Sequence, residues 1–106
     1  MNQQAFESGK RAYQEADWLR AVTLLDGAKQ PGEVAGEADH LRGNAYMKLG
    51  QFDAAAAAYE SALADTSYGK KGALCCNRGR ALLAAGRAQD AVVALTEAVG
   101  DSSYAT

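Results

Sequence analysis

The chain has little of what many specialised folds and sites require. Its 106 residues include two cysteines, one proline and one histidine. Two adjacent cysteines cannot form the disulfide framework of a small secreted domain, so a reducing compartment such as the cytoplasm is expected. A single histidine leaves few ligands for zinc, and no stretch matches a phosphate-binding loop or a serine-nucleophile motif. The sequence therefore predicts no enzyme activity, no metal and no cofactor.

Long apolar runs and a surplus of charge of one sign are also missing. No stretch approaches the roughly 20 apolar residues of a membrane span, and residues 1–4 lack the features of a signal peptide. The net charge is −2, whereas a protein that binds the nucleic-acid backbone needs a basic face. A short basic cluster, formed by Lys70, Lys71, Arg78 and Arg80, is better explained as a solvated helix start. Neither a nucleic-acid nor a membrane partner is expected.

Alanine is the most frequent residue, and with one proline the chain has few helix breakers. Alanine loses no side-chain entropy in a helix and is the best helix former. The hydrophobic share of 48% and the charged share of 23% are typical of one small folded domain. We therefore expect a single all-α domain over residues 1–106.

The chain repeats itself with a period close to 35 residues (roughly the length of a known class of helical repeat). Small residues fall at equivalent positions in three copies, namely Gly9, Gly43 and Gly79, then Ala21, Ala55 and Ala91, then Ala28, Ala62 and Ala98. The three repeats are predicted at about residues 2–35, 36–69 and 72–105. The spacing indicates two extra residues between the second and third copies, near 66–69.

Each copy is predicted to form two helices separated by a turn. The apolar stripes at helical spacing place these helices at residues 6–15, 18–29, 38–49, from 52 onward, 74–85 and 88–99. Gly50 and Gly86 end the first helices of the second and third copies, and Asp17 caps the second helix of the first copy. Ala16 stands at the equivalent turn of the first copy, where a Cβ costs roughly 1 kcal/mol if the turn is left-handed.

This pattern resembles the tetratricopeptide repeat, a helix–turn–helix unit. The second copy carries Gly43-x2-Tyr46, Ala55-x3-Tyr59 and Ala62, and the other two copies carry equivalents. The closing proline of the family is displaced to Pro31 in the first copy and absent from the others. The resemblance covers the whole chain and implies an α-solenoid of three antiparallel helix pairs in a right-handed superhelical stack.

The resemblance also implies a concave groove lined by the first helix of each unit. On the groove positions of the family we predict a peptide-binding site at Phe6, Lys10, Tyr13, His40, Asn44, Lys48, Asn77 and Arg80. Amides at such positions suit a peptide backbone, and the basic residues among them favour an acidic partner. The predicted function is a non-catalytic scaffold that binds a protein or peptide. An ordinary solvated helix face is the alternative explanation of these residues.

The sequence gives little support for two more specialised sites, a carboxylate clamp and a zinc site. Chaperone-binding members of the family hold a terminal carboxylate with Lys, Asn, Asn, Lys and Arg, where this chain has Phe6, Lys10, Leu41, Ala73 and Asn77. Four of these five residues lack the required chemistry, so that clamp is not expected. His40 and Cys76 share one groove position in neighbouring units, but zinc needs four ligands, and Cys75 points away on its helix.

The end of the third copy suggests an alternative function. The segment 63–68, which leads into the third copy, recurs at 99–104, where only two residues follow. A solenoid needs a polar capping helix at its end, so the chain is expected to be a piece of a longer array. Its last helix would expose the stripe Ala91, Val92, Leu95, Ala98 and Val99. The alternative is therefore a self-association module, with a homo-oligomer formed through the exposed repeat end.

Overall fold

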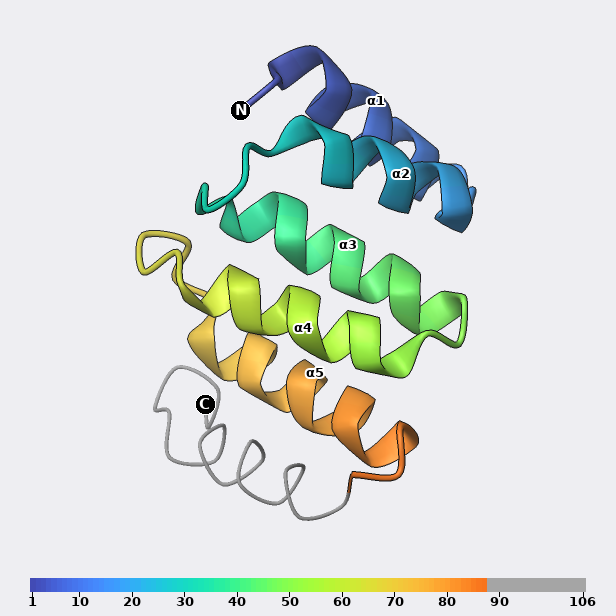
Figure 1. Cartoon of the computed structure of the whole chain (residues 1–106), viewed down its shortest axis with the longest axis vertical. Coiled ribbons are helices and arrows are strands. Elements are labelled where there is room, and N and C mark those ends of the chain that lie inside the picture. The colour runs from blue at the N-terminus through green and yellow to red at the C-terminus, as the bar shows by residue number, and fades with distance from the viewer. Residues whose placement is uncertain (88–106) are drawn as a thin grey trace.

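The structure is a computed structural model that describes residues 1–87, and it is entirely helical over that range, with no strand. The helices are α1 (Gln3–Gln14), α2 (Trp18–Ala28), α3 (Gly36–Lys48), α4 (Phe52–Leu63) and α5 (Lys71–Ala84). They stack in chain order, and each packs against the next (Figure 1). This arrangement is the expected α-solenoid of antiparallel helix pairs. The predicted helix at 88–99 lies outside the described residues.

The first helix of each unit begins earlier than the apolar pattern predicts. Helix α1 begins at Gln3 because the Asn2 side chain caps it, accepting a hydrogen bond from the Ala5 N–H at 3.1 Å. Helix α3 begins at Gly36, whose N–H donates to the Asp65 carboxylate at 2.8 Å. That carboxylate lies beyond α4, so a local pattern could not reveal it. The predicted cap of α2 is confirmed, since the Asp17 carboxylate accepts from the Arg20 N–H.

The turn inside each helix pair depends on one residue in the left-handed conformation. Gly50 and Gly86 have φ angles of +75° and +82°, which glycine adopts without a steric penalty. Ala16 occupies the equivalent turn with φ +61°, so the left-handed turn expected from the sequence is confirmed. An L-residue with a Cβ pays roughly 1–2 kcal/mol in this conformation. The first turn is therefore strained where the other two are not.

Replacing Ala16 with glycine should stabilise the protein. Relief of the left-handed strain outweighs the greater flexibility of glycine in the unfolded chain, so Ala16→Gly should raise the free energy of unfolding by about 0.5–1 kcal/mol. Gly50→Ala is the matched control. It adds a Cβ that meets no atom within 4 Å, so it should lower stability through the backbone alone. Urea unfolding measures both changes, and an Ala16→Gly variant no more stable than the original would contradict the assignment of strain.

Paired helices approach each other closely because a glycine on one faces a large side chain on the other. A Cβ on Gly43 would lie 2.6 Å from Cε1 of Tyr59, and a Cβ on Gly9 would lie 2.8 Å from Cγ of Leu25. Real Cβ atoms do not come so close. Tyr59 and Leu25 hold equivalent positions on α4 and α2, and they are 2% and 0% exposed. Both helix pairs therefore pack in the same way, with a large side chain against a glycine. That side chain is Leu25 in the first pair and Tyr59 in the second.

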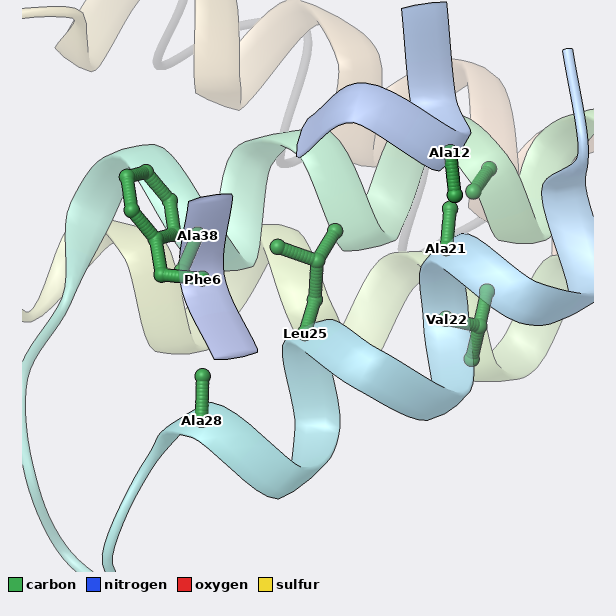
Figure 2. Close-up of a cluster of buried hydrophobic side chains, with 8 residues drawn as sticks. Phe6, Ala12, Ala21, Val22, Leu25, Ala28 and Ala38 are labelled. Atoms are coloured by element: carbon green, nitrogen blue, oxygen red, sulfur yellow. The ribbon is translucent and has the colours of Figure 1, made fainter. Parts of the chain in front are cut away.

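The first unit and the start of the second share one apolar core. Its buried members, drawn in Figure 2, are Phe6, Ala12, Ala21, Val22, Leu25, Ala28, Ala38 and Ala45. Ala12 lies close to Ala21 where α1 meets α2, and Phe6 lies beside Ala38 of α3 (Figure 2). Alanine at these crossings allows the helix backbones to approach. The core thus continues across the boundary between units, as stacking of repeats requires.

An ionic cluster joins the first unit to the second. Asp39 is fully buried, at 0% exposed, and accepts hydrogen bonds from Lys29 Nζ at 2.8 Å and Arg42 Nη2 at 3.0 Å. Arg42 also pairs with Asp26 at 3.1 Å. At the equivalent positions of the next interface stand Leu63 and Cys75, and Leu63 packs against the buried cluster of Cys75 and Cys76. The same contact is therefore ionic between α2 and α3 and apolar between α4 and α5.

Breaking this cluster on one side should cost far more than replacing its central pair. Asp39→Asn removes the buried counter-charge of Lys29 and leaves Arg42 paired only with Asp26. We expect a loss on the order of 3 kcal/mol in the free energy of unfolding. The double variant Lys29→Leu with Asp39→Cys copies the chain's own apolar contact and should recover most of that loss, to within about 1 kcal/mol of the original. Urea unfolding of both variants checks the prediction. A double variant as unstable as the single one would contradict it.

Candidate functional site

Five of the eight predicted groove residues meet in one pocket on the face formed by α1, α3 and α5. The pocket has a volume of about 230 Å³ and is lined by Tyr13, Asn44, Met47, Lys48, Tyr59, Asn77 and Arg80. We call it the central pocket. Its lining comes from both described units and from α5, so it exists only because the helices stack. It is the place where the structure brings the predicted site residues together.

A chain of hydrogen bonds forms the floor of the central pocket. Tyr59 Oη donates to Asn44 Oδ1 at 2.6 Å, and Asn44 Nδ2 donates to Tyr13 Oη at 3.2 Å. Burial raises the pKa of the Tyr59 phenol well above its ordinary value, so Tyr59 stays protonated and acts as the donor. The donors in this series of hydrogen bonds therefore all point the same way, from α4 through α3 to α1. The series ends at Tyr13, whose own hydroxyl proton is not used within it.

His40 lies at the other end of the same face with both ring nitrogens engaged. Its Nδ1 is 2.8 Å from Tyr68 Oη, and its Nε2 is 3.4 Å from Asn77 Nδ2. Because the amide nitrogen of Asn77 can only donate a hydrogen bond, Nε2 of His40 is the acceptor. The ring proton then lies on Nδ1 and is donated to Tyr68 Oη. The ring also lies edge-on to Tyr59 and Tyr68, with centroids 6.1 Å and 5.8 Å apart. His40 thus links α3 to α5 and to the turn before it.

The ring of His40 is not arranged as a metal ligand. Its nitrogens already have protein partners, and Cys76, the other residue considered from the sequence, is buried. Over residues 1–87, no group of three or more His, Cys, Asp or Glu side chains could hold a metal ion.

Phe6 and Lys10 lie away from the central pocket. Phe6 is only 7% exposed and packs among the core alanines, so the prediction of an exposed groove contact at this residue is wrong. Phe6 lies on α1 beside Ala38 of α3 and belongs to the same buried cluster (Figure 2). Lys10 Nζ lies 5.9 Å from the centre of the Phe6 ring and pairs with Glu37 at 3.0 Å. Both residues therefore connect α1 to α3.

The two cations of the central pocket have no acidic partner among residues 1–87. Lys10, Lys29 and Arg42 each form an ion pair in that range, whereas Lys48 and Arg80 form none there. Lys48 Nζ instead lies 6.0 Å from the centre of the Trp18 ring. Within the described part of the chain, no carboxylate lines the pocket. The local charge is therefore positive, although the chain as a whole is negative.

The sequence predicts Tyr59 as a residue of the repeat motif and does not assign it to the site. The ring is buried, but its hydroxyl reaches the pocket floor. A comparison of the repeats could have indicated this role. The equivalent position in the first unit is Leu25, so the second unit adds a hydroxyl group at a position that is otherwise apolar. Tyr68 was also missed, and it comes from the two-residue extension near 66–69. Its ring packs so closely on Gly36 that a Cβ there would lie 2.6 Å from Tyr68 Cβ.

Acidification should weaken the fold through His40. Burial, and then the nearby charge of Lys70, lower its pKa below the ordinary value of 6.5. The unfolded chain therefore binds a proton more readily than the folded one, and stability falls as the pH drops through 6.5. Between about pH 7 and about pH 5, the original protein should lose more stability than His40→Gln, which cannot titrate. Urea unfolding at both pH values measures the difference, and equal losses would contradict this role.

The comparisons with known proteins agree with this geometry. Residues 40–66 match the family model of the tetratricopeptide repeat. That segment covers most of α3, the glycine turn and α4, which together form one complete helix–turn–helix pair. No curated protein matches the chain. Across residues 1–87, every helix is too short or too polar to span a membrane. The family match at residues 40–66 and the stacked helix pairs together fit a helical repeat that resembles the tetratricopeptide repeat.

Proposed function

We propose that the chain is a non-catalytic scaffold that binds a peptide or protein segment across the face of α1, α3 and α5. The central pocket carries this proposal, because it combines cations and amides, and no carboxylate from residues 1–87 lines it. Tetratricopeptide repeats are in general protein–protein interaction modules without catalytic activity. The proposal assigns that general role to one face of this chain.

The amide side chains of the face suit an extended peptide. Asn44 and Asn77 each use one amide N–H in the bonds to Tyr13 and His40, which leaves the second N–H of each free of those bonds. A peptide backbone supplies carbonyl oxygens at regular spacing, and pockets between helices supply selectivity for its side chains. The amides are held in place before the peptide arrives, so the side chains lose little conformational entropy on binding.

The charge of the face favours an acidic partner. Lys48 and Arg80 line the central pocket in a chain whose net charge is −2. Exposed charges of this kind act on the association rate more than on the affinity. We therefore expect binding to weaken as salt is raised. The two cysteines, Cys75 and Cys76, are buried thiols that suit a reducing compartment such as the cytoplasm.

Self-association through the last unit stays a prediction, because the stripe on which it rests lies in residues 88–106, outside the described range. Light scattering of the free chain over a range of concentrations separates this alternative from peptide binding. A dimer that forms with rising concentration and competes with peptide would favour the alternative.

The proposal is tested by selecting binders from a display library of random 12-residue peptides. The enriched peptides should shift backbone amide signals of α1, α3 and α5 around the central pocket in nuclear magnetic resonance spectra. Asn44→Ala should weaken their binding about fivefold, the equivalent of one hydrogen bond of about 1 kcal/mol. Gln51→Ala, in the exposed turn before α4, is the control and should have no effect. Enriched peptides that instead shift α2 and α4, or a library with no enrichment, would overturn the proposal.

A further inference from the structure

We propose that the central pocket is a subsite for one side-chain carboxylate of the bound peptide, held between Lys48 and Arg80 and by the hydroxyl of Tyr13. The inference rests on the proposed function and names the chemical group that the face selects. It is carried by the direction of the hydrogen bonds, by the charges of the lining and by the room in the pocket.

The hydrogen bonds leave two donors of the pocket lining unused. Tyr59 donates to Asn44, which in turn donates to Tyr13. The Tyr13 oxygen accepts in this chain, so its proton is available to a ligand. The second amide hydrogen of Asn44 is available beside it. A ligand that enters here meets donors, and the group that satisfies several donors at once is an acceptor with two oxygens, such as a carboxylate.

The charges select the same group. Lys48 and Arg80 both line the pocket, and neither is neutralised by a carboxylate within residues 1–87. Lys10, which was also expected to contribute to the groove, is already paired with Glu37. Arg80 lies close enough to Tyr59 for its charge to oppose the rise of the Tyr59 pKa, which places positive charge over the pocket floor. An acidic side chain between these cations would supply the missing counter-charge.

The pocket has room for the group without rearrangement. Its volume of about 230 Å³ exceeds several times the roughly 30 Å³ that one water molecule occupies in the liquid. The carboxylate with its methylene groups therefore replaces water. Met47 supplies an apolar wall for the methylenes. The lining also differs from the chaperone-binding clamp, because at three of that clamp's positions this chain has Phe6, Leu41 and Ala73.

The test uses three pools of acetylated and amidated 12-residue peptides that are random except for a fixed central residue, which is Glu, Gln or phosphoserine. Fluorescence anisotropy should show the Glu pool binding about tenfold more tightly than the Gln pool at low salt, the value expected from two partly exposed charge pairs. Lys48→Gln with Arg80→Gln should abolish the difference. Arg20→Gln with Lys71→Gln removes the same charge from residues outside the pocket and should preserve it.

The outcomes distinguish a failure of the carboxylate subsite from a failure of the proposed peptide binding. If no pool shifts the amide signals of the α1, α3 and α5 face, the proposed function fails. If the Glu and Gln pools bind that face equally, the function stands and the carboxylate subsite is wrong. The subsite is also wrong if only the phosphoserine pool binds, or if the control double variant removes the preference as fully as Lys48→Gln with Arg80→Gln.

Discussion

The ring of Tyr59 lies directly on the backbone of Gly43, and this contact sets the distance between α3 and α4. Any side chain at Gly43 would push the two helices apart, because a first Cβ would already meet the ring. The close approach also brings the Tyr59 hydroxyl within 2.6 Å of Asn44 Oδ1, the side chain next to Gly43 on α3. One packing constraint therefore produces both the core of the second unit and the polar floor of the central pocket. In the first unit Leu25 makes the same contact with Gly9 and brings no polar group with it.

The contacts between units differ in chemistry from one interface to the next, whereas the contacts within each of the first two units pack a large side chain against a glycine. The buried Asp39 cluster ties α2 to α3, whereas the corresponding interface between α4 and α5 is apolar, with Leu63 packed against the buried cysteines of α5. A buried ion pair gains little over an apolar pair of similar size, because desolvation offsets the attraction. Its larger effect is on selectivity, since pairing Lys29 with an apolar partner would bury an uncompensated charge. The two interfaces are chemically distinct, and this distinction favours one order of units over an exchange between them.

Much of the fold follows from the sequence because the features that determine it are local and repeated. The turns at Gly50 and Gly86 need a left-handed residue, and the helical period then fixes which side chains share a face. That reasoning places Asn44 and Arg80 on one surface. It fails at Phe6, because the register gives the direction of a side chain but not what the next helix places over it. Tyr68 was not predicted for a related reason, since the turn between α4 and α5 shows no local pattern that reveals what the Tyr68 ring packs against.

The position shared by Phe6 and His40 shows how one place in the repeat takes two chemistries. In the first unit the phenyl ring is buried in one cluster with Ala38 and adds to the core. In the second unit the imidazole is only partly covered, and each nitrogen must find a partner, which Tyr68 and Asn77 supply. Because these polar groups satisfy one another, the face is stable without a ligand. The side chains are then already oriented when a peptide arrives, so the conformational cost of binding falls mainly on the peptide.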